Sequence, residues 1–243
     1  MFSGKIEDYI LFEDKEIIVC RKPAGIAVQN ARIGAMDLES SLKNYLAMQD
    51  GGGRRIPYLA VIHRLDQPVE GILVFGKTPE AAKSLSAQIT AGKMEKIYLA
   101  VTYGKQAEAG KKEKVLEDYL KKDGKSNTSS VVNANTPGAK KARLSYEVLG
   151  EAVDAISGKK KWLLRIHLDT GRHHQIRVQM AHAGMPLAGD RKYGAGTNVT
   201  IGAGSLALCA ASLTFFHPVT GKVMKFVTNP EGPEFKGISI PQM

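Results

Sequence analysis

LAVIHRLDQPVEGILVF, residues 59–75, is the stretch on which the interpretation of the whole chain depends. Its two apolar runs, 59–62 and 72–75, have the length and the β-branched content of buried strands. Between them Arg64 and Asp66 place a guanidinium and a carboxylate at the end of the first strand. An isolated Asp in a loop is usually a turn former or a cap, so any case for chemistry has to come from the rest of the chain.

Short runs of β-branched and aromatic residues recur along the chain and predict strands. Many strands with few strand–helix–strand alternations predict an α+β fold on a largely antiparallel mixed sheet, flanked by a few helices and loops. The predicted strands are 10–12, 17–20, 59–62, 72–75, 97–102, 144–149, 162–168, 213–216 and 223–227.

Three helices are expected from cap residues and apolar stripes. The first runs from 38 to about 48 with Asp37 as its N-cap, and the second starts at Thr78-Pro79 and ends before Gly92. The third begins near Arg172 or His173 and ends by 184.

The chain has 243 residues and a formal net charge of +10, which favours a polyanionic partner. A chain of this length can bury one core, so we expect one domain over 1–243. The segment 158–192 is strongly basic, with eight Lys and Arg against two Asp. The segment 104–126 is nearly balanced, with seven Lys against five acidic residues, and is expected to be a solvated charged insertion.

Several function classes are disfavoured by what the sequence contains. Cys20 and Cys209 stand alone in apolar stretches, which indicates neither a disulfide framework nor a metal knuckle. The acidic N-terminal segment does not resemble a signal peptide, and no uncharged stretch suits a bilayer span, so a cytoplasmic, soluble protein is expected. No glycine motif bridges a strand and a helix as nucleotide binding requires.

Three segments, 61–71, 95–100 and 169–194, combine polar residues with apolar surroundings. In 95–100, strand alternation places Lys96 and Tyr98 on the same face of a sheet. The third segment carries five polar side chains within six positions, Arg172, His173, His174, Gln175 and Arg177.

With these motifs the chain resembles the RluA-type pseudouridine synthases, which isomerise selected uridines in ribosomal or transfer RNA. The resemblance implies a pseudouridine synthase core with an active-site cleft across the middle of the sheet, and a reaction without metal or other cofactor. The similar motifs are Lys22-Pro23-Ala24-Gly25, HRLD at 63–66 with Gly71 and Leu73, 96–100, 170–194 and the hairpin 216–221.

The resemblance also implies roles for individual residues. Asp66 would be the catalytic carboxylate and Arg177 its ion-pair partner. Tyr98 would stack on the uracil, near the proton that leaves carbon 5, and Arg64 would occupy the space vacated by the extruded nucleotide. The residues expected to bind the substrate are Arg64, His63, Ile176, Arg172 and Lys96.

The sequence departs from many relatives at three positions. Glu70 stands where Ser is common and places a second carboxylate near Asp66, His173 replaces a common Thr, and Cys209 replaces a common His. The resemblance further implies the form without the small N-terminal RNA-binding domain. We therefore expect a monomer that recognises RNA through its catalytic domain and does not associate with membranes.

Other interpretations stay open at this point. A nucleosidase or glycosidase would use Asp66 and Glu70 as paired carboxylates, and a non-catalytic RNA-binding protein would share the scaffold. Taken alone, Tyr98 is more often a structural tyrosine. The histidines 173, 174 and 182 lack the spacing of a metal site and are expected to be RNA-facing or structural. Arg172, Lys192 and the run 159–161 suit either a solvated surface or phosphate contacts.

Overall fold

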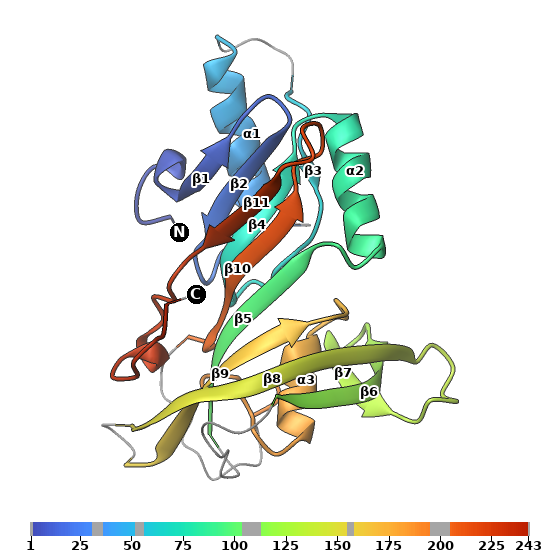
Figure 1. Ribbon diagram of the computed structural model, residues 1–243, viewed down its shortest axis with the longest axis vertical. Helices are drawn as coiled ribbons and strands as arrows, with labels where there is room; N and C mark the ends of the chain where they lie inside the picture. The colour runs from blue at the N-terminus through green and yellow to red at the C-terminus, as the bar shows by residue number, and fades with distance from the viewer. Residues whose placement is uncertain are drawn as a thin grey trace. The chain divides into compact units, whose positions relative to one another are not determined.

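The computed structural model describes residues 2–30, 36–51, 56–103, 113–154, 158–194 and 205–242 (Figure 1). The chain divides into two compact units. The first unit comprises Met1–Glu95 and Ala210–Asn229, and the second comprises Lys96–Cys209 and Pro230–Met243. That the two units work as one catalytic domain over 1–243 stays a prediction. In the described part of the chain, no helix is long and apolar enough to cross a membrane.

The first unit is built on a sheet in the order β1-β2-β4-β10, with β3 paired to β4 and β11 paired to β10. The pairs β1–β2, β2–β4, β3–β4 and β10–β11 are antiparallel. The strands are β1 (Ile10–Glu13), β2 (Ile17–Lys22), β3 (Ala60–Val61), β4 (Glu70–Gly76), β10 (Leu208–Phe216) and β11 (Val223–Val227).

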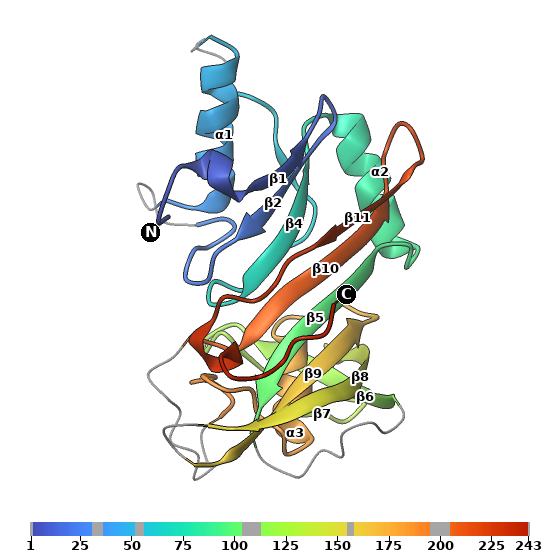
Figure 2. The same ribbon diagram turned by 60° about the vertical axis from the view of Figure 1, so that its left-hand side comes forward.

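Two α-helices and a short 3-10 helix, η1 (Ile6–Tyr9), complete the first unit (Figure 2). Helix α1 (Leu38–Gln49) begins as predicted, because the side chain of Asp37 accepts a hydrogen bond from the amide of Ser40 at 2.7 Å. Helix α2 (Pro79–Thr90) is capped in the same way by Thr78. Its Leu85 lies in a core formed with Val74 of β4 and Phe215 of β10.

The second unit holds an antiparallel sheet in the order β5-β9-β8-β6-β7. Helix α3 (Gln175–His182) lies against β6 and β7 (Figure 1), where Val178 packs on Leu120 and Ala142. The strands are β5 (Glu95–Thr102), β6 (Lys114–Asp123), β7 (Thr128–Val132), β8 (Lys140–Val153) and β9 (Lys160–Leu168), and a short 3-10 helix, η2 (Pro233–Phe235), follows.

Each of the predicted strands and helices is present, and the largely antiparallel α+β fold is confirmed. Within the segment 104–126, expected to be a charged insertion, residues 114–123 form β6 between β8 and β7. Most of its charged side chains are exposed, so the segment is solvated as expected, but backbone pairing on both sides makes it regular. Residues 104–112 lie outside the described part of the chain.

Helix α3 starts later than predicted. It begins at Gln175, because His174 takes a left-handed conformation with φ of 55° and cannot be part of a right-handed helix. Ile176 and Met180, four residues apart on this helix, are both buried.

Gly71, the glycine after the HRLD loop, is required by a close approach within the first unit. Its φ is +129°, and a Cβ added there would lie 2.4 Å from the carbonyl oxygen of Ala210 in β10. Contacts under 3.0 Å to backbone do not occur, so a larger residue must displace β4 from β10.

We therefore expect Gly71→Ala to lower the free energy of unfolding by about 3 kcal/mol or more, through strain and overpacking. Gly92→Ala is the matched control, since Gly92 also has a positive φ, +65°, but meets nothing within 4 Å. Its cost should be about 1–2 kcal/mol. Urea unfolding of both variants measures the difference, and equal costs would contradict the close-approach argument.

Candidate active site

The HRLD loop of the first unit is organised by a buried lysine. Lys22 ends strand β2 and is fully buried, although its aliphatic stem leads to a charged ammonium. Its Nζ donates to the carbonyl oxygens of Pro23 at 3.0 Å, Ile26 at 2.7 Å and Gln67 at 3.1 Å. An ammonium has three donors, so these bonds satisfy the whole group.

Two further hydrogen bonds join the loop after β2 to the HRLD loop. The amide of Gly25 donates to the carbonyl of Gln67 at 2.8 Å, and the side-chain amide of Gln67 donates back to the carbonyl of Gly25 at 3.0 Å. The amide of Val69 donates to the carbonyl of Asp66 at 3.0 Å and closes a turn. Asp66 is therefore presented, half-buried, from a backbone that is fixed on both sides.

The predicted neighbours of Asp66 differ in their surroundings. Arg64 is exposed, while His63 is half-buried, and its Nε2 accepts a long hydrogen bond of 3.4 Å from the amide of Val74. Glu70, the departure noted in the sequence, is buried at the start of β4. That it places a second carboxylate near Asp66 stays a prediction.

The charges of Asp66 and Glu70 both act on the buried ammonium of Lys22. Burial lowers the pKa of Lys22 from 10.5 to about 7, while the negative charges of Asp66 and Glu70 act in the opposite direction. Asp66 and Glu70 thus share one buried cation.

In the second unit, Tyr98 lies on the face of the sheet that α3 covers. Tyr98 of β5 pairs with Ile166 of β9, which pairs with Tyr146 of β8, so the three side chains share a face. Ala142, four residues before Tyr146, is on that face and packs against Val178 of α3. Tyr98 is only 6% exposed.

Lys96 lies on the same face as Tyr98 by strand alternation, as predicted, and is half-buried. Burial lowers its pKa. The same burial makes Lys96 easier to deprotonate than a surface lysine.

Arg177 is 5% exposed and forms a two-pronged ion pair with Asp190. Its Nε donates to Oδ2 and its Nη2 to Oδ1, both at 2.8 Å. Oδ1 also accepts the amides of Lys192 and Tyr193, and the Tyr193 ring centroid lies 5.1 Å from the guanidinium carbon. A buried charge needs such compensation, so this network fixes the orientation of Arg177.

Tyr193 links Arg177 to strand β7. Its hydroxyl accepts the amide of Ser129 at 2.8 Å and bonds to Nδ1 of His174 at 2.7 Å. The ring of His173 stacks on that of His174 at 3.7 Å, and its Nδ1 bonds to the hydroxyl of Ser129 at 2.9 Å. These contacts agree with a structural role for the two histidines.

The predicted site residues therefore fall into two groups. Those of the first unit are His63, Arg64 and Asp66; those of the second are Lys96, Tyr98, Arg172, Ile176 and Arg177. Ile176 is buried, and exposed Arg172 donates from Nε to the carbonyl of Lys141 at 2.9 Å.

Three residues of these networks were not predicted. Lys22 was quoted only as part of a motif, and Asp190 and Tyr193 only within the segment 169–194. Lys22 is two residues after Cys20 and so on the same face of the strand as that buried residue, a signal that could have marked it as buried. Nothing local marks Asp190, because its partner lies 13 residues earlier and on another element.

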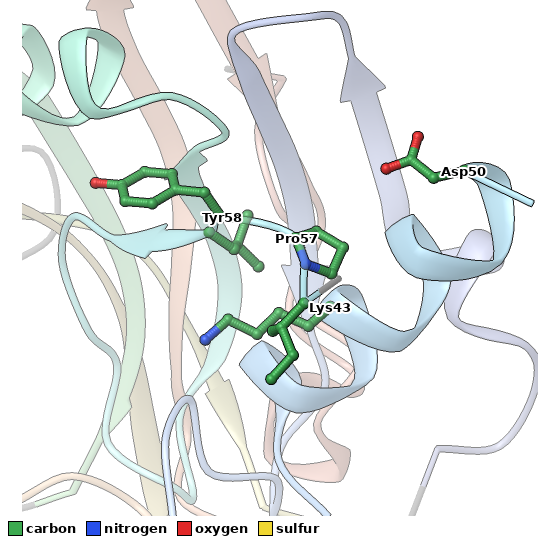
Figure 3. Close-up of a pocket in the computed structure, with 6 residues that line it drawn as sticks. Lys43, Asp50, Pro57 and Tyr58 are labelled. Atoms are coloured by element: carbon green, nitrogen blue, oxygen red, sulfur yellow. The ribbon is translucent and has the colours of Figure 1, made fainter. Parts of the chain in front are cut away.

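The first unit also has a pocket of about 680 Å³, lined by side chains of α1 and of the segment before β3 (Figure 3). None of the predicted site residues lines it. Its lining residues are Lys43, Asp50, Ile56, Pro57, Tyr58 and Leu59.

The shifted pKa of Lys22 predicts a pH-dependent stability. Between pH 7 and the ordinary pKa of 10.5, the unfolded chain binds more protons than the folded chain. The free energy of unfolding should therefore rise with pH across this range, by up to about 1.4 kcal/mol per unit, and this contribution should be constant below it.

Urea unfolding between about pH 7 and pH 8.5, below the range where the cysteines and tyrosines of the unfolded chain ionise, measures this rise. Lys22→Met should lack it. In Glu70→Gln the rise should start at lower pH, because one of the charges that raise the pKa of Lys22 is gone. Parallel curves for the wild type and Lys22→Met would contradict the assignment.

Comparisons with known proteins agree with the motifs. The family model described as RNA pseudouridylate synthase matches residues 16–182. A large-subunit ribosomal pseudouridine synthase D from Xanthomonas campestris is 29% identical over 89% of this chain and 64% of its own length. The corresponding protein of Pseudomonas aeruginosa is 33% identical over 91% of this chain and 68% of its own length.

The chain spans about 64% of the length of the first of these relatives. Among solved structures, the human RNA pseudouridylate synthase domain containing 1 has a TM-score of 0.73 and 20% identity, over 95% of this chain and 86% of that one. This likeness shows the fold. Together with the family match over residues 16–182, it confirms the resemblance seen in the motifs, and the chain belongs to the RNA pseudouridylate synthase family.

Proposed function

We propose that this protein isomerises uridine to pseudouridine in RNA, with Asp66 as the catalytic carboxylate. The observation that carries the proposal is the fixed presentation of Asp66. Its loop is bonded to the segment 22–26 by the Lys22 ammonium and by two bonds between Gly25 and Gln67. Such fixed geometry is what a group that attacks or orients a nucleoside requires.

The reaction breaks the bond between N1 of uracil and C1′ of ribose and forms a bond between C5 and C1′. The proton on C5 leaves and N1 gains a proton, so there is no redox change and no net consumption of water. The residues must hold the target nucleotide out of its stack, retain the free base and assist the proton transfer.

The proposal also assigns roles in the reaction to Arg177 and Tyr98. The pair with Asp190 holds the guanidinium of Arg177 through Nε and Nη2. We propose that Arg177 also pairs with Asp66 and keeps it ionised. Tyr98 stacks on the uracil, near the proton that leaves carbon 5, and Arg64, the exposed member of HRLD, occupies the space left by the extruded nucleotide.

The substrate we propose is ribosomal RNA of the large subunit, because the relatives in Xanthomonas and Pseudomonas carry that activity in their names. Transfer RNA is the second candidate. We further propose that the enzyme acts as a cytoplasmic monomer, with RNA as its partner and without a cofactor.

The hydrolytic alternative needs a second carboxylate that reaches water. Glu70 is only 7% exposed and its charge interacts with buried Lys22, which disfavours such a role. A hydrolase would release free uracil from RNA, whereas the isomerase would not.

The test is Asp66→Asn, which removes the nucleophilic charge and keeps the shape. Pseudouridine formed in unmodified ribosomal and transfer RNA transcripts, mapped by carbodiimide modification and primer extension, should fall by about a thousandfold or more. Glu80→Gln, at an exposed carboxylate of α2, should retain full activity.

Two outcomes would contradict the proposal. Undiminished pseudouridine formation by Asp66→Asn would remove Asp66 from its role. Free uracil released by the wild type, detected by chromatography, would favour the nucleosidase instead.

A further inference from the structure

The basic segment 158–192 consists of two parts with different surroundings. The side chains of its first part are bonded within the second unit. Lys161 is buried, and its Nζ donates to the carbonyls of Glu234 and Lys236 at 2.9 and 3.0 Å. Lys160 and Arg165 form ion pairs with Glu151 and Glu147. This part is therefore structural.

The second part meets the β6–β7 hairpin. The Nζ of Lys192 donates to the carbonyl of Asn127 in the hairpin turn at 2.8 Å, and Arg172 donates to the carbonyl of Lys141 at the start of β8. Both cations are exposed. The acceptors are neutral, so these bonds orient the two side chains without cancelling their charge.

Lysines of β6 and β8 extend this surface. Lys122 is opposite Ser129 and Lys140 is opposite Leu120, so both are on the sheet face that α3 covers, beyond its apolar contact. Lys125 lies in the same turn as Asn127. We call these five exposed cations the basic shelf: Lys122, Lys125, Lys140, Arg172 and Lys192.

The acidic residues near the shelf are engaged elsewhere. Asp118 accepts a hydrogen bond from Gln179 at 2.8 Å, Asp169 pairs with Arg143, and Asp190 pairs with Arg177. Asp123 accepts bonds from Ser126 and from the amide of Lys125, and strand alternation places it on the opposite face from Lys122. Asp169 and Asp190 are thus paired with arginines and Asp118 keeps its charge, so the five cations leave the shelf with a net positive charge.

The shelf is joined to Arg177 through Tyr193. Ser129, the register partner of Lys122, donates its amide to the hydroxyl of Tyr193, whose ring lies 5.1 Å from the Arg177 guanidinium. His173, next to Arg172, bonds to the same Ser129. A polyanion on the shelf would therefore lie beside a residue assigned to the reaction.

We infer that the basic shelf binds the phosphates of the RNA that flanks the target uridine. This inference rests on the proposed function, since it assigns the RNA-binding surface of the same enzyme. Exposed cations, two of them oriented by bonds to neutral carbonyls, are suited to a backbone that carries one charge per nucleotide, and each phosphate contact adds to the salt dependence of binding. The shelf then positions the RNA without reading its sequence.

The test compares two variants with the same net charge. The shelf variant carries Lys122→Gln, Lys125→Gln, Lys140→Gln and Lys192→Gln, and the control variant carries the same change at Lys5, Lys15, Lys83 and Lys93, which are exposed in the first unit. A fluorescently labelled RNA stem–loop with uridines in its loop is the binding probe, titrated at several salt concentrations.

We expect the shelf variant to bind at least about tenfold more weakly and to lower the slope of log affinity against log salt by about 3, whereas the control variant should change little. Arginine at the four shelf positions should restore binding. Equal losses in both variants, or no loss in the shelf variant, would overturn the inference.

Binding and pseudouridine formation are measured separately, so the two proposals can fail independently. A wild type that binds the stem–loop through the shelf but forms no pseudouridine in any transcript would overturn the proposed function and leave the shelf in place. A wild type that is active while the shelf variant binds normally would overturn the shelf alone.

Discussion

The first unit depends on one buried ammonium. A lysine taken out of water costs several kcal/mol unless its donors are satisfied, and Lys22 satisfies all three on carbonyl oxygens of two different loops. The need to satisfy these donors has two consequences for the loops. The loops must come together to accept these bonds, and once together they fix the backbone on which Asp66 stands.

The same constraint organises the second unit around a buried guanidinium. Arg177 is held by Asp190 from one side and by the face of Tyr193 from another, and Tyr193 is itself bonded to Ser129 and His174. Each unit therefore holds a proposed site residue, Asp66 or Arg177, in a network that compensates a buried charge.

Local signals were sufficient for most of the fold. The caps Asp37 and Thr78 and the apolar runs of the strands act within a few residues, so the sequence alone located them. Strand β6 was missed because its stability comes from pairing with β7 and β8, while its own residues are mostly charged. The late start of α3 follows from the left-handed His174, which binds Tyr193, 19 residues later.

The candidate site also combines features that local sequence predicts with features that depend on distant residues. The residue types of HRLD and of the segment after 169 pointed to the chemistry, and Glu70 was recognised as unusual. The residues that bond to Lys22 and Arg177 are distant from them in the sequence. Gln67 is 45 residues from Lys22, and Asp190 is 13 residues from Arg177. Such partners follow from strand register, here Lys22 opposite Gly71, which no local pattern contains.

Amide hydrogen exchange tests the role of Lys22 most directly. The amides of Gly25 and Val69 donate to the carbonyls of Gln67 and Asp66, so they report on the loop that Lys22 holds. In Lys22→Met these two amides should exchange at least about tenfold faster, while the amides of β8 and β9 keep their wild-type rates. Unchanged exchange at Gly25 and Val69 would contradict the claim that the buried ammonium holds Asp66 in place.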